Sequence, residues 1–213
     1  MPVKLILKQI LALAPNARSS YRDAFSNAQP TLDRIGISVN PLRLAHFMAQ
    51  VLHECGNLTI QFENLNYSKE RLPIVWPSRF LPKGPLNPEL FAHNLEKLAN
   101  EVYGGRMGNN LPGDGFKYRG RGLLQLTGKD SYTEATSLIK KFEPLCPYFV
   151  ADPDQVISSS WCIAVAAVEW ESKGCNKLAD QDLVRAITRK INGGEIGMAD
   201  RIEQMRRAKN IWH

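Results

Sequence analysis

Two glutamates in the stretch VLHECGNLTIQFENLNYS are the first candidates for chemistry, because Glu54 and Glu63 lie only nine positions apart. Glu54 follows Phe47 by seven positions and Val51 by three, so helical spacing places it on the flank of an apolar stripe. A carboxyl group beside apolar neighbours loses hydration, which favours its protonated form. Glu63 stands in the polar segment ENLNY, which favours the ionised form. One protonated and one ionised carboxyl group can cleave a glycosidic bond. Two solvated surface charges are the alternative.

The element that carries Glu54 is expected to be a helix. It begins where Asn40 precedes Pro41, a pair typical of a helix N-terminus. Apolar residues then recur at helical spacing as far as Cys55, and Gly56 is expected to end the helix. Periodicity predicts an amphipathic helix at the N-terminus and further helices over 88–103, 131–142, 153–172, 180–191 and 198–212.

The segments between these helices differ in composition. The glycines and asparagines of YGGRMGNNLPGDG predict a loop, and LPIVWPSRFLPKGPLNP predicts a loop with at most one short helix. In FKYRGRGLLQLTG, residues that favour strands are interrupted by glycines, which predicts a short, kinked hairpin or strand. No repeat or linker divides the chain. We therefore expect one domain over 1–213, predominantly α-helical and of the α+β class.

Composition narrows the class of partner. The net charge of +6 and the isoelectric point near 9.2 favour an anionic partner, although a solvated basic face explains them equally well. No stretch approaches the roughly 18 apolar residues of a membrane span. Lys8 and Gln9 interrupt the apolar run near the N-terminus, so we expect no signal peptide. The chain is therefore expected to stay in the cytoplasm in which it is made, unless another factor releases it.

Cysteine spacing gives no sign of a metal site. None of the four cysteines forms a C-x-x-C pair or has a histidine at zinc-ligand spacing. Without an export signal we expect reduced, partly buried thiols. No metal ion and no organic cofactor is expected. The cysteines are Cys55, Cys146, Cys162 and Cys175.

Four segments together resemble the family 19 glycoside hydrolases, which include chitinases and related bacteriophage endolysins. They are AQVLHECGNLTIQFENLNYS, LANEVYGGRMGNN with GDGFKYRGRGLLQLTGKDSY, ITRKINGG, and ADRIEQMRRA. The segments run in the family's order and span about 45–208, which is most of the chain. The resemblance implies a lysozyme-like, two-lobed single catalytic domain over 1–213, with a small β element beside a catalytic groove and without a separate wall-binding domain.

The resemblance also implies roles for individual residues. Glu54 matches the general acid, Glu63 matches the general base, and Thr127 matches the hydroxyl residue that holds the attacking water. Gln125 matches a residue that lines the sugar groove. A hydroxyl group can accept from water and donate to a carboxylate at once, which agrees with the role of Thr127. The alternative for Thr127 and Gln125 is ordinary strand polarity.

Further matches concern sugar binding. Asn192 and Arg201 match groups near the second carboxylate and the bound sugar. Their alternatives are a helix C-cap and a surface charge, respectively. Ser131 stands where the family usually has asparagine, and its shorter side chain offers one donor instead of two. The aromatic residues Tyr67, Tyr118, Trp76 and Phe116 are candidate platforms for sugar stacking, with a place in the core as the alternative.

The expected reaction is inverting hydrolysis of a β-1,4-linked amino-sugar polymer. The short interval between the carboxylates is similar to the endolysin branch, so bacterial peptidoglycan is the expected substrate and chitin the alternative. The protein is then expected to be a monomer that waits in the host cytoplasm until it reaches the cell wall and causes lysis, without binding nucleic acid or inserting stably into a membrane. A wall-binding protein without catalysis and a lytic transglycosylase are the rival hypotheses.

Overall fold

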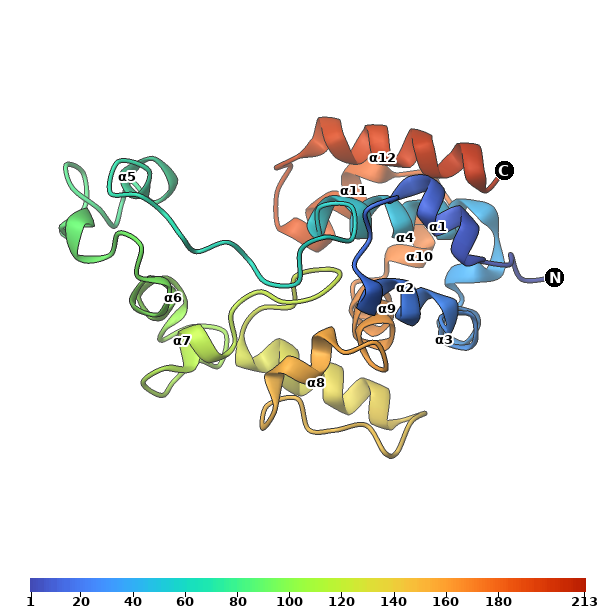
Figure 1. Ribbon diagram of the computed structural model, residues 1–213, viewed down its shortest axis with the longest axis horizontal. Coiled ribbons are helices and arrows are strands. Elements are labelled where there is room, and N and C mark those ends of the chain that lie inside the picture. The colour runs from blue at the N-terminus through green and yellow to red at the C-terminus, as the bar shows by residue number, and fades with distance from the viewer.

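The computed structural model describes all 213 residues, which form a large helical lobe and a smaller lobe beside it (Figure 1). Each lobe has its own hydrophobic core. The large lobe packs around 46 buried apolar residues, and the small lobe around seven that lie between Leu65 and Val102. Two separate clusters explain the two lobes, because each apolar surface can be buried only within its own cluster. This agrees with the expected two-lobed, predominantly helical fold.

The large lobe is built around helix α4 (Pro41–Glu54). Asn40 caps this helix as expected, since its side-chain oxygen accepts a hydrogen bond of 2.8 Å from the backbone amide of Arg43. Helix α12 (Met198–Ile211) packs along α4, and helix α9 (Cys162–Ser172) contacts it through an edge-to-face pair of Phe47 and Trp170. The lobe also contains α1 (Leu7–Leu13), α2 (Ser19–Ser26), α3 (Gln29–Ile35), η1 (Ile37–Val39), α8 (Lys129–Lys140), η3 (Pro153–Ile157), α10 (Cys175–Ala179) and α11 (Val184–Asn192).

The chain leaves the large lobe after α4 as an extended segment and forms the small lobe (Figure 1). The expected helix over 88–103 is divided. Its start is the short 3-10 helix η2 (Pro88–Leu90), and α6 (Leu95–Tyr103) begins after Asn94, whose side chain accepts from the amide of Lys97 at 3.0 Å. The proline-rich segment forms one short helix, α5 (Leu72–Val75), as expected. Helix α7 (Asp114–Lys117) leads back to the large lobe.

Two other expected helices are also divided. The segment 153–172 forms η3 and α9 rather than one helix, because the Ser158 hydroxyl donates to the carbonyl of Gln155 and closes the first turn. The segment 180–191 becomes helical only at Val184, after Asp182 adopts a left-handed conformation. Helix α8 begins at Lys129, two positions before the expected start. The last helix agrees with its predicted range.

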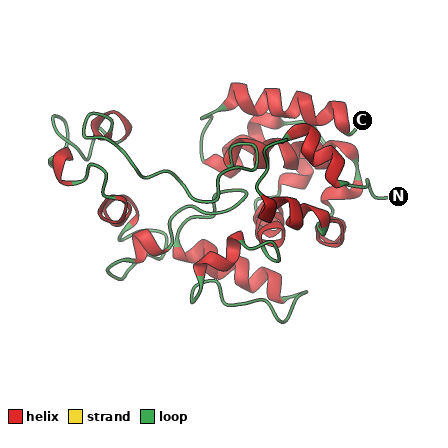
Figure 2. Cartoon of the chain, in the orientation of Figure 1, coloured by secondary structure: helices red, strands yellow, loops and turns green.

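The expected hairpin is reduced to isolated bridges, so no strand is drawn in Figure 2. Arg121 pairs with Leu126 in a tight turn, and Phe62 pairs with Arg121. The amide of Glu63 donates to the carbonyl of Gly120 at 3.1 Å. Glycines within a strand weaken it, which explains why the pairing stays short. The turn nevertheless fastens the segment before the small lobe to the segment after it.

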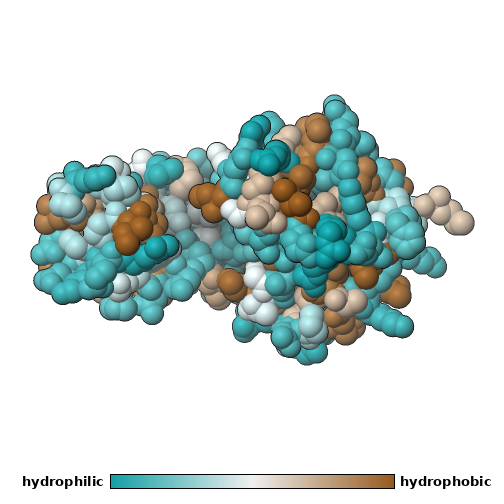
Figure 3. Space-filling model, turned by 90° about the horizontal axis from the view of Figure 1, so that it is seen from above, coloured by the Kyte–Doolittle hydropathy of each residue, from teal (hydrophilic) through white to brown (hydrophobic).

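All four cysteines are free and buried, as expected for reduced thiols. Burial raises the pKa of the Cys55 and Cys162 thiols to about 12, so both stay protonated. None of the helices combines the length and apolar character that a bilayer span requires. Hydrophilic residues prevail on the face in Figure 3, which is hollowed where the two lobes meet.

Candidate active site

An open groove of about 620 Å³ contains both carboxylates that the sequence singles out. Glu54 reaches it from the end of α4 in the large lobe. Glu63 reaches it from the extended segment that leads to the small lobe. Tyr103 at the end of α6 and Asn192 at the end of α11 line the same groove. The two carboxyl groups can therefore act on one bound molecule.

Glu54 is fixed by a buried ion pair. Its side chain is 15% exposed, and Oε1 accepts from Arg201 Nη2 at 2.5 Å. Arg201 is buried on α12 and also donates to the side chain of Gln50 and to the carbonyl of Ile196. Charge-assisted bonds of this kind orient a carboxylate strongly. Because Oε1 takes the ion pair, Oε2 is the oxygen available to a ligand.

This contact corrects one expectation. The sequence places Arg201 near the second carboxylate and the sugar, whereas the structure pairs it with Glu54 and buries it away from solvent. The physical reason is the packing of α12 along α4, which brings Arg201 against the last turn of the helix that carries the proposed acid. Arg201 therefore positions a carboxyl group and does not face the groove.

Glu63 is held by neutral donors instead. Its Oε2 accepts from the Tyr103 hydroxyl at 2.6 Å, and its Oε1 accepts from the amide of Gly120 at 2.6 Å. These two bonds fix the orientation of the carboxyl group. Burial, and then the negative charge of Glu63, raise the pKa of Tyr103, so the phenol keeps its proton and remains a donor. Glu63 is thus held by two donors from different parts of the chain, a phenol of the small lobe and a backbone amide of the tight turn.

Three predicted residues converge around Gly120. A Cβ atom added there would lie 3.1 Å from Gln125 Oε1, 3.2 Å from Thr127 Oγ1 and 3.3 Å from Glu63 Cβ. Glycine leaves the space that these side chains occupy. The Thr127 hydroxyl donates to the Gln125 carbonyl at 2.8 Å, and its lone pairs remain free to accept from a water molecule. Gln125 itself adopts a left-handed conformation with φ of 55°, a form of backbone strain often found at functional sites.

Two further predicted residues line the groove. Ser131 lies near the start of α8. Asn192 is the last residue of α11, where Gly193 follows in the left-handed conformation of a C-cap. The Nδ2 atom of Asn192 is buried and has no hydrogen-bond partner in the protein. It is therefore available as a donor to a molecule in the groove.

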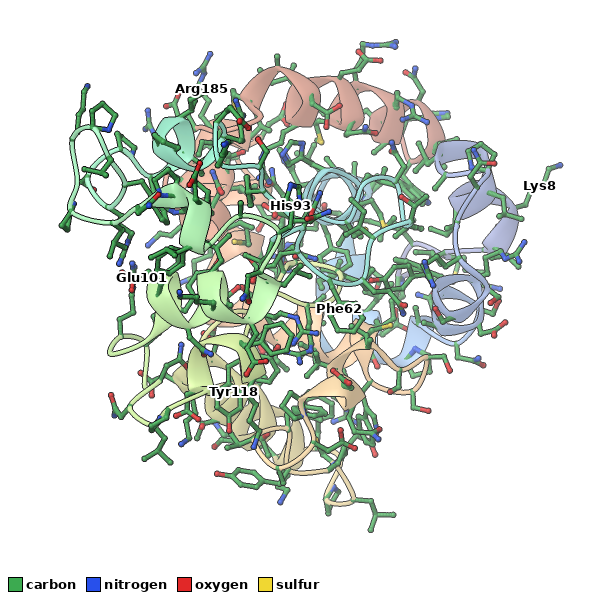
Figure 4. All side chains as sticks on the ribbon, turned by 60° about the vertical axis from the view of Figure 1, so that its left-hand side comes forward. Lys8, Phe62, His93, Glu101, Tyr118 and Arg185 are labelled. Carbon is green, nitrogen blue, oxygen red and sulfur yellow. The ribbon has the colours of Figure 1, made fainter.

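Tyr118 belongs to the core and not to the groove. Its side chain is 1% exposed, its hydroxyl donates to the carbonyl of Val150 at 3.0 Å, and its ring packs against Tyr132 of α8. Figure 4 shows Tyr118 beside the ribbon of α8. The expectation that Tyr118 contacts a sugar is wrong, because its side chain is buried in the large lobe. There it anchors the segment that precedes the tight turn.

The other aromatic candidates lie in or near the small lobe. Tyr67 and Trp76 pack edge to face with ring centroids 5.0 Å apart. The Phe116 ring lies 4.0 Å below the guanidinium of Arg119. All three rings are partly buried against the small core, and none of them lines the groove. Sugar stacking on Tyr67 stays a prediction.

Comparisons with known proteins show the family to which the chain belongs. The chain is 35% identical over 171 residues to a "Glycosyl hydrolase family 19 domain-containing protein" of Haemophilus influenzae, covering 79% of this chain and 79% of that protein. The chain belongs to glycosyl hydrolase family 19. It is therefore a glycoside hydrolase. None of the family models matches the chain.

Solved structures show the same fold for this family 19 enzyme. Chitinase C from Streptomyces griseus HUT6037 aligns with a TM-score of 0.59 at 19% identity, over 97% of this chain and 76% of that one. A bacterial family 19 chitinase aligns with a TM-score of 0.58 at 20% identity, over 97% and 94% of the two chains. At this identity the likeness concerns the fold, which is chitinase-like and mainly helical.

The family 19 groove also contains residues that the sequence did not single out. Tyr103 lies within a recognised motif, but only the fold shows that it binds Glu63. Arg106 lines the groove from the loop after α6, and Lys190 lines it from α11. Glu169 lies on α9 within the apolar run IAVAAVEW, and a lone carboxylate in such a run is a signal that could have identified it.

Proposed function

We propose that this family 19 enzyme hydrolyses β-1,4 bonds in the glycan of bacterial peptidoglycan by single displacement with inversion, an endolysin-type activity that would act at lysis of a bacterial host. The observation that carries the proposal is the pair of carboxyl groups in one groove, with charge-assisted anchoring of Glu54 and two neutral donors on Glu63.

In this mechanism, Glu54 donates a proton from Oε2 to the oxygen of the departing sugar, while Oε1 keeps its bond to Arg201. Glu63 removes a proton from a water molecule on the opposite face of the sugar ring, and Thr127 helps to hold that water. The water attacks the anomeric carbon as the glycosidic bond breaks. Inverting enzymes keep the two carboxyl groups about 6.5–9.5 Å apart to admit the water.

Charge in the groove supports peptidoglycan as the polymer. Arg106 and Lys190 present two cationic groups to the groove. Chitin is an uncharged polymer, whereas peptidoglycan carries carboxylates on its peptide stems. The net charge of +6 would add a longer-range attraction to an anionic wall. Chitin remains the second candidate, because the similar solved structures are chitinases.

Two substrates separate these candidates. Purified protein should lower the turbidity of bacteria whose outer membrane has been permeabilised, and should release less sugar from colloidal chitin. We expect the double variant Arg106→Gln, Lys190→Gln to lose roughly tenfold in activity on peptidoglycan and to keep its activity on short, uncharged chitin oligomers. Lys8→Gln, a change at an exposed residue of α1 remote from the groove, is the matched control. Cleavage of chitin with no loss of turbidity would refute the peptidoglycan proposal.

The stereochemistry has its own test. Proton NMR of the first products should show the α-anomer when β-1,4 bonds are cut, and initial release of the β-anomer would exclude inversion. Mass spectrometry distinguishes the rivals, because a lytic transglycosylase leaves anhydro-sugar ends and a protein that only binds the wall leaves no cut glycan.

A further inference from the structure

Phe62, the residue directly before Glu63, contacts two arginine side chains (Figure 4). The centroid of its ring lies 5.0 Å from the guanidinium carbon of Arg119 and 5.5 Å from that of Arg121. A guanidinium group within about 6 Å of an aromatic centroid is attracted to the face of the ring. Phe62 is partly buried and does not line the groove, so its ring has a use other than sugar binding.

These contacts continue into the hydrophobic cores of both lobes. The guanidinium of Arg119 also lies 4.0 Å from the centroid of Phe116, which packs against the small core. The guanidinium of Arg121 lies 5.8 Å from the centroid of Tyr132, a buried residue of the large core, and donates to its hydroxyl at 3.0 Å. We call Phe116, Arg119, Phe62, Arg121 and Tyr132 the cation–π network. It connects the two lobes through the residue next to Glu63.

The two arginines of the network are held in different ways. Arg121 is buried, forms an ion pair of 2.8 Å with Asp154 and donates to two backbone carbonyls. Arg119 is partly buried, and its burial and then the charge of Arg121 lower its pKa. Two like charges at close range repel each other. The rings of Phe62 and Phe116 offset this repulsion, so Arg119 depends on them for its place.

The segment that carries both arginines also binds Glu63. Gly120, which stands between them, accepts from the Glu63 amide at 3.1 Å and donates its own amide to Glu63 Oε1 at 2.6 Å. Phe62 pairs with Arg121 in an isolated bridge. The segment 119–121 therefore holds Phe62 through its arginines and Glu63 through its glycine. A shift of the Phe62 ring would also move the carboxyl group.

We propose that Phe62 is a positioning residue for the reaction, which keeps Glu63 at a fixed place relative to Glu54 through the cation–π network. The inference rests on the proposed role of Glu63 as the base. Precise placement matters there, because a displacement of about 1 Å can lower the rate of an enzyme about 10²-fold. Phe62 acts through Glu63 and touches neither the sugar nor the attacking water.

Hydrogen exchange provides the first test, without any substrate. Phe62→Leu removes the ring and keeps an apolar side chain. Mass spectrometry should then show exchange at least about tenfold faster in peptides covering 62–64 and 119–121, and unchanged exchange in α4 and α12. Phe142→Leu is the matched control, because Phe142 is also partly buried and its centroid lies 5.3 Å from the guanidinium of Arg34 in the large lobe. It should leave exchange at both segments unchanged.

Kinetics on soluble glycan strands provides the second test. Phe62→Leu should lower kcat by roughly 10–100-fold with little change in KM, because Phe62 does not line the groove. Phe62→Tyr keeps the ring and should retain near wild-type kcat. Phe142→Leu should retain it as well. If chitin is the polymer that the protein cuts, chitin hexamers replace the glycan strands.

A double-mutant cycle separates positioning from a general loss of structure. If Phe62 acts through Glu63, Phe62→Leu should have no further effect on the residual rate of Glu63→Gln. A structural defect elsewhere would lower the rate in both backgrounds by the same factor. Arg119→Lys is a second variant if Phe62→Leu does not fold. It keeps the charge and loses the planar group that contacts two rings, so it should lower kcat by a similar factor.

Three results would overturn the inference: wild-type exchange at 62–64 and 119–121 in both variants, wild-type kcat in both variants, or equal losses from Phe62→Leu with and without Glu63. Exchange reports on the network even if the wild-type protein cuts no glycan. Failure of the proposed function and failure of this inference are therefore distinguishable.

Discussion

The two carboxylates of the groove are held in opposite ways. Glu54 ends a buried helix of the large lobe, and a buried arginine from α12 fixes it. Glu63 lies on an extended segment between the lobes, and its partners are a phenol from the small lobe and a backbone amide from the tight turn. The acid is therefore positioned by the core, whereas the base is positioned by hydrogen bonds at the junction of the lobes.

The cores behind the two carboxylates also differ. The large lobe buries 46 apolar residues in one cluster and the small lobe seven. Stability follows buried apolar surface, so the small lobe should open more readily than the large one. Tyr103 belongs to the small lobe, which means that the surroundings of Glu63 can change with lobe opening while those of Glu54 stay fixed. Each of the following variants tests one side of this comparison.

Loss of either carboxylate should give the largest effect. Glu54→Gln and Glu63→Gln should each lower the rate of glycan hydrolysis by up to about 10⁴-fold, because each removes a proton-transfer group. Their effects on stability should differ. Glu54→Gln also removes a charge from the ion pair with Arg201, and only this variant should melt at a clearly lower temperature. Equal melting temperatures of the two variants would contradict the idea that the core positions Glu54 whereas hydrogen bonds at the junction of the lobes position Glu63.

Removal of the buried arginine is expected to have the next largest effect. Arg201→Met leaves Glu54 without its partner, so the free energy of unfolding in urea should fall by about 3–5 kcal/mol. Arg206→Met is the control on the same helix, where the pair with Glu203 is exposed to solvent and its loss should change stability far less. If the free energy of unfolding falls no more in Arg201→Met than in this control, burial of the ion pair does not contribute to stability.

Glu169 predicts a dependence of stability on pH. Burial raises its pKa in the folded protein to about 7, above the ordinary value of 4.5 expected in the unfolded chain. The folded state therefore binds the proton more tightly. The resulting stability is complete below pH 4.5 and is lost as the pH rises through 7, by up to about 3 kcal/mol. Denaturation curves of Glu169→Gln should lack this decline, and parallel declines in both proteins would contradict the assignment.

The smallest expected effect concerns the partner of the base. Tyr103→Phe removes one donor to Glu63, so activity should fall roughly tenfold and stability by about 1 kcal/mol. Tyr67→Phe removes a hydroxyl from the same lobe at a ring that packs against Trp76, and it should retain near wild-type activity. Equal activities of the two variants would mean that the Tyr103 hydroxyl does not support the base.

Local features were predictable from the sequence because they depend on neighbouring residues. The Asn40 and Pro41 pair marked the start of α4, and helical spacing placed Glu54 beside its apolar stripe. The glycine-rich motif marked a turn, although its pairing proved shorter than a hairpin. The family motifs placed Glu63, Gln125 and Thr127 in the sequence, and these residues do meet around Gly120.

Contacts between distant parts of the chain were decided only by the tertiary structure. Arg201 and Glu54 are 147 positions apart, and Tyr103 and Glu63 are 40 apart, so no local pattern pairs them. The burial of Tyr118 and the place of Glu169 at the groove depend on which helices pack together, so the tertiary structure decided both. The sequence by itself determines the types and the order of the reactive groups. The tertiary structure decides which groups become partners, because ion pairs and hydrogen bonds act over a few ångströms in space, whatever the separation in sequence.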